Sequence, residues 1–235
     1  MYKSHSQFQA LSDPNATIWK YMDIFKYLTI LQREELFLQR VDKYQDKYDG
    51  FMPTFRNGDT LNGSPLNPEM IQGLNDAYNQ TRQYAYANCW TLNEHESSLM
   101  WDCYSNKLGG VAIKSTLQRL CDSVIDGRDI YVNPVKYDFP NIELGNIYFP
   151  LLSKRPQFND EKEVRLFYTD LEGVKPNAKK NLVDHIYIKV NLDTLIESAF
   201  FHPATPDWML ETLTAVISKY KTKVPIKSML YSNTD

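Results

Sequence analysis

Apolar residues recur along the chain with two different periods. Short apolar or alternating runs, such as 18–22 and 84–90, are separated by segments whose apolar residues return every three or four positions. The first pattern is typical of β-strands and the second of helices with one buried face. The predicted strands are 18–22, 36–38, 84–90, 111–113, 130–137, 163–168, 186–190 and 224–229, and the predicted helices begin after Asp23, Asn67 and Thr205 and near Glu96 and Ser115.

The order of these elements predicts the fold class. Strands and helices are interspersed without a strict βαβ rhythm, and neither a Gly-rich dinucleotide fingerprint nor a Walker loop is present. We therefore expect an α+β fold with a mixed, largely antiparallel sheet, continuous or split, and flanking helices. We expect residues 1–16 to be a loosely ordered N-terminal segment and 17–235 to be a single domain. Residues 42–64 and 140–159 are predicted to be long irregular stretches.

Composition and charge narrow the class of protein. Hydrophobic residues make up 43% of the chain, and the formal net charge is −3, so it lacks the overall positive field of duplex nucleic-acid binders. No signal peptide and no apolar run long enough to cross a bilayer is apparent, which favours a cytoplasmic protein without membrane contacts. The three cysteines have no zinc or disulfide spacing and are expected to be reduced, mostly buried thiols. The oligomeric state is not indicated.

The most prominent candidate for chemistry is Glu161-x-Glu163. On a strand, residues two apart project from the same face, so both carboxylates are expected to point together. Such a pair can serve acid–base catalysis, orient a hydroxyl or bind a metal. The alternative is a solvated strand face, or an ion pair of Glu163 with Arg165 or Lys154. Lys20 and Tyr21 follow one another on the first strand, so alternation places them on opposite faces. Lys20 is a candidate contact for a phosphate or carboxylate, and Tyr21 is a candidate for stacking on a ring. The alternative is a core tyrosine with a solvated lysine.

A second polar group lies between two apolar blocks at 93–97. His95, flanked by glutamates, is a candidate general base or single metal ligand, although no metal site is predicted here. The alternative is a helix cap, with Ser97 in the first turn. The aromatic residues Trp101 and Tyr104 either wall a ligand pocket or belong to the core. Asp46 and Asp49, three apart in the long loop, are expected to cap a turn, with metal binding as the alternative.

Several blocks agree in order and spacing with a known family: 19–22 with 36–38, 45–50, 88–113, 158–165 and 188–208. From about Trp19 to about Tyr220, the chain resembles the mainly bacterial family filed as domain of unknown function 2971. Two positions depart from the family pattern: Lys47 stands where proline is expected, and Asp49 stands where glutamate is expected.

A strand with the basic-aromatic pair Lys20-Tyr21, a helix, a second strand and a distant acidic strand with Glu161-x-Glu163 follow one another in the chain. In this arrangement the chain also resembles, more remotely, ADP-ribosyltransferase-like domains. This resemblance implies NAD, a small nucleotide ligand, bound in the cleft of a split mixed sheet. It implies that Lys20 and Tyr21 contact the cofactor, that Ser97 or Ser98 contributes from the middle of the chain, and that Glu163 carries catalysis. Lys20 departs from the pattern, because that position is expected to be arginine or histidine.

Three functional hypotheses follow from these observations. The leading one is an NAD-dependent ADP-ribosyltransferase in a toxin or phage-defence role, with a protein or nucleic acid as acceptor. The second is a metal-dependent nuclease or hydrolase that uses Glu161, Glu163 and His95. The third is a non-catalytic sensor whose aromatic cleft binds a peptide or a small ligand.

Overall fold

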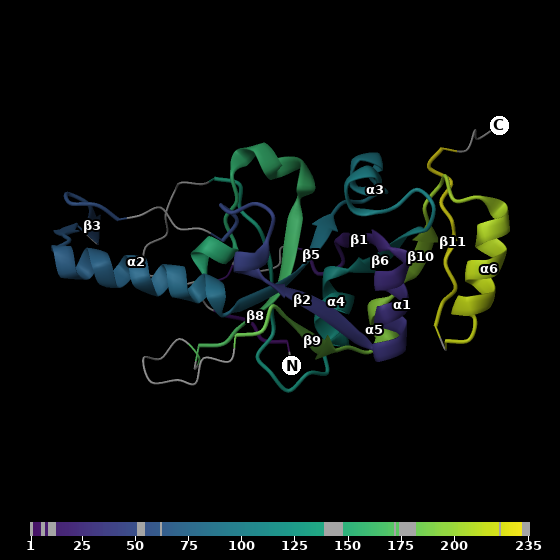
Figure 1. The fold of residues 1–235 in the computed structure, drawn as a ribbon, viewed down its shortest axis with the longest axis horizontal. Helices are drawn as coiled ribbons and strands as arrows, with labels where there is room; N and C mark the ends of the chain where they lie inside the picture. Colours follow the sequence, from purple (N-terminus) through teal and green to yellow (C-terminus); the bar gives the residue numbers. More distant parts are fainter. Residues whose placement is uncertain are drawn as a thin grey trace.

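Strands form where apolar residues alternate or run together, and nine of them join in one sheet (Figure 1). The structure is a computed structural model that describes all residues except 1, 6–7, 9–12, 51–54, 62, 139–147, 172, 174–181, 221 and 232–235. The strands of the sheet are β1 (Thr17–Asp23), β2 (Glu35–Arg40), β5 (Ala85–Leu92), β6 (Gly110–Thr116), β7 (Tyr131–Pro134), β8 (Glu163–Thr169), β9 (His185–Lys189), β10 (Ser198–Phe201) and β11 (Ile226–Lys227), and β3 (Thr60–Leu61) pairs with β4 (Ser64–Pro65) separately.

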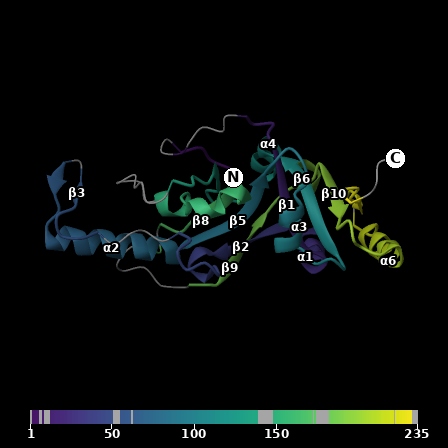
Figure 2. The same ribbon diagram turned by 90° about the horizontal axis from the view of Figure 1, so that it is seen from above.

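Helices flank this sheet and connect its strands. Figures 1 and 2 show α2 and β3 projecting from one end of the molecule, with α6 at the other end. Of the helices that the structure describes, none is long and apolar enough to cross a bilayer. The helices are α1 (Ile24–Arg33), α2 (Pro68–Gln83), α3 (Ser98–Tyr104), α4 (Leu117–Ser123), α5 (Leu192–Leu195) and α6 (Asp207–Ile217), and short 3₁₀ helices cover Val41–Lys43, Phe149–Leu151 and Pro156–Glu161.

The sheet is mixed and largely antiparallel. Its main path runs β11-β10-β6-β1-β5-β2-β9, while β8 pairs with both β5 and β7. Among the described strand pairs, β10 and β11 are parallel and the others are antiparallel. The expected α+β fold with flanking helices is therefore confirmed. The expectation of an edge position for Pro134 also holds, because β7 pairs only with β8 in the described part of the chain.

The sheet forks along one edge of β5. The other edge of β5 pairs with β8 from Ala85 to Thr91. On the forked edge, β5 pairs with β2 only at 86–87 and with β1 only at 91–92. Residues 88–90 therefore lack a strand partner there, since β1 and β2 diverge on either side of α1. Side chains bridge the gap instead: Asn88 donates to the Phe37 carbonyl at 2.7 Å, and Lys20 donates to the Cys89 carbonyl at 2.9 Å.

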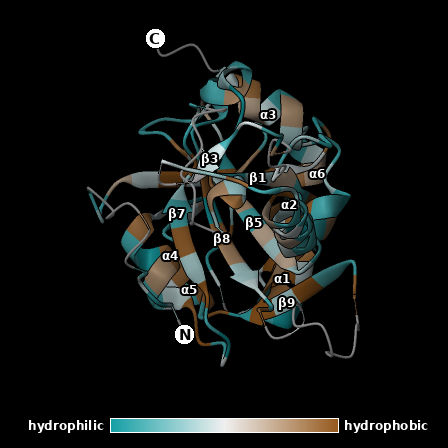
Figure 3. Ribbon diagram, turned by 90° about the vertical axis from the view of Figure 1, so that its left-hand side faces the viewer, coloured by the Kyte–Doolittle hydropathy of each residue, from teal (hydrophilic) through white to brown (hydrophobic). Residues whose placement is uncertain are grey.

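Alternate side chains of β1 pack into two separate hydrophobic cores. Ile18 and Met22 lie in the main core, which includes residues of α1 and α4. Trp19 and Tyr21 point to the opposite face, where they pack with Met100 and other residues under α3. Figure 3 shows hydrophobic residues along β5, β7 and β8, in agreement with their burial. Burying a side chain of this size contributes about 1.5–3 kcal/mol, so both faces of β1 help to fix its position.

Helix starts were predicted with mixed success. The Asp23 and Asn67 side chains accept backbone N–H groups at the starts of α1 and α2, as expected. The cap predicted for Thr205 is wrong, because Pro206 is extended and occupies the cap position, so α6 begins at Asp207. The predicted start at Ser115 is also wrong: Ser115 lies within β6, and its hydroxyl donates to the Leu195 carbonyl at 2.5 Å.

Other departures concern short or exposed segments. β10 was not predicted, because four residues are too few to show a clear alternation. Cys103 is exposed rather than buried, whereas Cys121 is buried, as expected. In the N-terminal segment, Tyr2 forms a bridge with Ile130. Residues 1, 6–7 and 9–12 lie outside the described residues, as does much of the irregular stretch predicted at 140–159.

Candidate functional site

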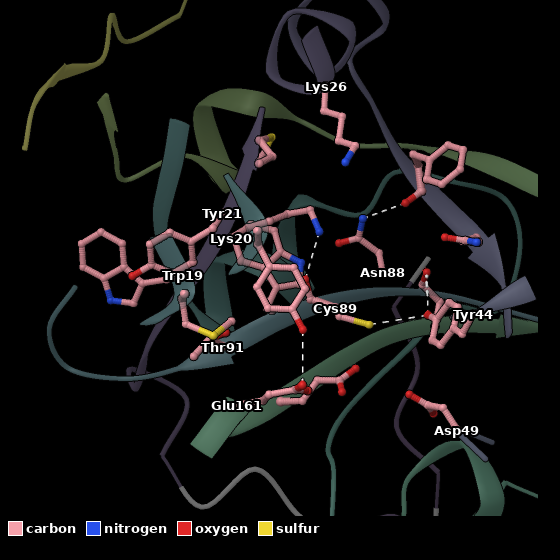
Figure 4. Close-up of a pocket in the computed structure, with 18 of the residues that line it drawn as sticks. Trp19, Lys20, Tyr21, Lys26, Tyr44, Asp49, Asn88, Cys89, Thr91 and Glu161 are labelled. Carbon is pink, nitrogen blue, oxygen red and sulfur yellow. Dashed lines mark hydrogen bonds between the residues drawn. The ribbon is translucent and has the colours of Figure 1, made fainter. Parts of the chain in front are cut away.

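A pocket of about 930 Å³ lies at the fork between β1 and β2 (Figure 4). Its volume falls within the range of about 300–1,000 Å³ that is typical of sites for small molecules and cofactors. Aromatic residues form much of its wall, and charged residues lie at two places within it. The aromatic lining residues are Trp19, Tyr21, Phe25, Phe37, Tyr44, Trp90, Tyr104, Phe158 and Tyr187.

The first charged place is Lys20, at the centre of the fork. Figure 4 shows its amine directed toward the backbone at Cys89, whose carbonyl accepts the 2.9 Å bond. The amine also lies 5.7 Å from the centre of the Trp90 ring. No carboxylate among the described residues forms an ion pair with it. Burial lowers the pKa of Lys20 to about 8, against smaller opposing effects of Cys89 and Glu163.

The second charged place is a group of five side chains that we call the ion cluster: Asp49, Lys154, Glu161, Glu163 and Arg165. Arg165 donates to Glu163 at 2.6 Å and to Asp49 at 2.7 Å. Lys154 donates to Glu161 at 2.5 Å and to Glu163 at 3.1 Å. Arg165 is fully buried and Glu163 is 5% exposed, so these ion pairs are shielded from water. Three carboxylates face two cations, which leaves one negative charge.

The ion cluster fixes the protonation state of its members. Burial by itself would raise the pKa of Glu163, but Arg165 and Lys154 outweigh it and lower that pKa to about 2. Burial opposes the charged form of Lys154, but Glu163 and Asp49 raise its pKa above the usual value. Burial raises the pKa of the neighbouring Cys89 thiol to about 12, so this thiol stays protonated. Glu163 is therefore an ionised group held by cations, and it is unsuited to proton transfer near neutral pH.

Glu161 and Glu163 belong to different secondary-structure elements, whereas one strand was predicted for both. Glu161 ends a 3₁₀ helix, and Lys162 takes a left-handed conformation with φ 43° before β8 begins at Glu163. The premise that both lie on one strand is therefore wrong. Their carboxylates still meet, because Lys154 binds both of them.

The structure brings together five of the eight residues predicted to act in catalysis or cofactor binding. Lys20, Tyr21, Tyr104, Glu161 and Glu163 all line the pocket. The side chains of Lys20 and Tyr21 project from opposite faces of β1. Both line the pocket because the fork opens the sheet between those faces. The Tyr104 hydroxyl lies 3.3 Å from Glu161 and donates to it.

The other three predicted residues do not line the pocket. Trp101 is fully buried and donates to Glu96 at 3.0 Å. Ser97 caps α3, and its backbone N–H donates to the Tyr21 hydroxyl at 2.9 Å. His95 is exposed. Within the described residues, no group of three or more His, Cys, Asp and Glu side chains could hold a metal ion.

The roles of two pocket residues, Asn88 and Asp49, were not predicted from the sequence. Asn88 bridges the fork and is 5% exposed, but an asparagine within an apolar strand gave no sign of this role. Asp49 was expected to cap a turn, and it instead pairs with Arg165, which lies 116 residues away. The turn expectation holds for Asp46, whose side chain accepts the Tyr48 N–H at 2.9 Å.

No family model, curated protein sequence or solved structure matches this chain. Its resemblance to the 2971 family and the more remote one to ADP-ribosyltransferase-like domains therefore stay predictions.

Proposed function

We propose that the pocket at the fork binds a nucleotide, with NAD as the first candidate. The observation that carries this proposal is the environment of Lys20. Four basic side chains line the pocket, and in the described structure the other three have carboxylate partners: Lys26 pairs with Asp23, Arg155 with Asp46, and Lys154 with the ion cluster. Lys20 has none, so a bound phosphate would supply the missing negative charge.

The remaining lining suits the other parts of a nucleotide. Aromatic faces such as those of Trp19 and Tyr21 can pack against a planar base or nicotinamide ring. The pocket lies between β1 and β2 where the sheet forks, and this position supports binding of a ligand in a cleft of the sheet. Free thiols such as Cys89 fit the reducing cytoplasm in which NAD is available.

In the enzymatic form of this proposal, the domain transfers ADP-ribose to a protein or nucleic acid. The bond between nicotinamide and ribose breaks, and positive charge develops on the ribose ring. The ionised Glu163 and the net negative charge of the ion cluster would stabilise that charge. Glu161, whose side chain is 20% exposed, is the carboxylate better placed to meet an incoming acceptor.

A second candidate is a nucleotide sensor without turnover. It is favoured by the bonding of Glu163, because both of its carboxylate oxygens already accept bonds from Arg165 or Lys154. A carboxylate so occupied has little capacity left for a substrate hydroxyl. Both candidates predict NAD binding, and they differ in nicotinamide release.

Calorimetric titration with NAD tests the shared proposal. Lys20→Met should weaken binding by about tenfold or more, since a hydrogen bond to a charged group contributes roughly 1.5–3 kcal/mol. Lys26→Met is the matched control, because this lysine lines the same pocket, has a side chain that is 72% exposed, and already pairs with Asp23. It should bind NAD like the wild type. Absence of NAD binding by the wild-type protein contradicts both candidates.

A nicotinamide-release assay then separates the two candidates. If the wild type releases nicotinamide and Glu163→Gln does not, the result supports the transferase. Glu161→Gln is the second variant in case Glu163→Gln does not fold. NAD binding without release supports the sensor.

A further inference from the structure

The pocket holds two lysines in opposite environments. Lys154 lies among three carboxylates, with Glu161 at 2.5 Å, Glu163 at 3.1 Å and Asp49 at 3.6 Å. These partners keep its ammonium group charged. Lys20 lies in the same pocket with a backbone carbonyl as its hydrogen-bond acceptor and an aromatic ring beside it. The structure therefore stabilises the charged form much more at Lys154, which has three carboxylates, than at Lys20, whose contacts are a carbonyl and a ring.

The single bond from Lys20 to Cys89 is compatible with a neutral amine. An –NH₂ group can donate one N–H to that carbonyl and still keep its lone pair free. The position of the amine is also fixed, since Lys20 belongs to β1 and its bond crosses to β5. A lysine that is desolvated in this way, without a carboxylate partner, is the form in which lysine acts as a nucleophile.

We propose that Lys20 is a nucleophilic amine that forms an imine with an aromatic aldehyde entering the pocket. The amine nitrogen adds to the carbonyl carbon and forms a C–N bond. The two amine hydrogens leave with the carbonyl oxygen as water, and a C=N bond remains. No oxidant or reductant is needed. The inference goes beyond the proposed function and does not depend on NAD.

The ligand class follows from the walls of the pocket. Aromatic side chains such as Trp19 and Trp90 favour a planar ring over a short aliphatic carbonyl compound. An imine nitrogen that takes up a proton is a cation. The ion cluster carries a net negative charge, and its three carboxylates, Asp49, Glu161 and Glu163, line the same pocket, so they would stabilise that cation.

The expected selectivity is large. At pH 7.5, an amine with a pKa of about 8 is unprotonated in roughly a quarter of the molecules. An ordinary lysine, with a pKa of about 10.4, is unprotonated in about 0.1% of them. The amine of Lys20 should therefore be about 200 times more available than an ordinary one, and restricted access to the pocket would reduce this advantage.

Pyridoxal 5′-phosphate, followed by borohydride, tests this inference. Borohydride delivers a hydride to the imine carbon and leaves a stable secondary amine, which peptide mass spectrometry locates. With limiting reagent at pH 7.5, Lys20 should be labelled at least tenfold faster than Lys26 or Lys154 in the same wild-type molecule. The rate should rise with pH and level off above about 8.

Two controls sharpen the test. Lys20→Arg keeps a cation that cannot form an imine, so labelling at this position should vanish while labelling of other lysines continues. Pyridoxine 5′-phosphate, which has an alcohol in place of the aldehyde, should leave no adduct. Labelling of Lys20 at or below the rate of Lys26 in the wild-type protein overturns the inference. Because NAD is absent throughout, this result would leave the nucleotide proposal unaffected.

Discussion

Replacing Arg165 should lower the free energy of unfolding more than a comparable substitution at the surface. Arg165 is fully buried and donates to Glu163, to Asp49 and to the Leu151 carbonyl. Arg165→Met keeps much of the side-chain volume but leaves two buried carboxylates to share Lys154 with Glu161. Breaking a buried ion pair in this way costs about 3–5 kcal/mol. The free energy of unfolding should fall by that amount.

Urea denaturation followed by tryptophan fluorescence measures this loss, with linear extrapolation to water. Arg155→Met is the matched control, because Arg155 also pairs with an aspartate of the same loop, Asp46, but its side chain is 38% exposed. An exposed pair contributes about 0–1 kcal/mol, so the control should lose little. If Arg165→Met costs less than about 1 kcal/mol, or no more than the control, the ion cluster is not the stabilising element described above.

Three further predictions follow from the same structure. The free energy of unfolding should decrease as pH falls from about 4.3, the ordinary value for glutamate, toward the folded pKa of about 2 for Glu163. The unfolded chain binds the proton at a higher pH than the folded protein does, so acid favours unfolding. A free energy of unfolding that is unchanged between a pH of about 4.3 and a pH of about 2 would contradict this prediction. Gly50→Ala should destabilise the protein for two reasons. The φ of Gly50 is +68°, so backbone strain alone should cost about 1–3 kcal/mol. The added Cβ would also lie 2.5 Å from Val41, and this clash should add to the loss. Gly63→Ala is the control, because Gly63 has the nearer φ of +81° and no heavy atom lies within 4 Å of the added Cβ, so equal losses in thermal melts would refute the clash. NAD affinity should weaken as pH rises through about 8, because Lys20 then loses its positive charge, and a calorimetric affinity unchanged from pH 7 to pH 9 would exclude Lys20 as the phosphate contact.

Local patterns predicted the elements of the fold well. Alternation and helical spacing identified β1, α1 and β2, and the cap residues Asp23 and Asn67 marked where two helices begin. These features depend on neighbouring residues, so a single sequence contains them. Thr205 was misread because a proline directly after a cap residue can itself take the extended cap position.

The fork and the ion cluster could not be predicted in the same way. The fork depends on where β5 stops pairing with β2 and starts pairing with β1, and this register is set by packing between distant segments. The partner of Asp49 lies 116 residues away, and nothing near Asp49 in the sequence indicates it. Glu161 and Glu163 were correctly grouped, but their spacing was interpreted as one strand when a left-handed Lys162 separates them.

The central claim is that the pocket between β1 and β2 receives a nucleotide at Lys20. A crystal structure determined with saturating NAD tests it most directly. The account predicts nucleotide density in the fork, with a phosphate oxygen within hydrogen-bond distance of the Lys20 amine. NAD bound elsewhere, or an empty fork with Lys20 still bonded only to the Cys89 carbonyl, would contradict it.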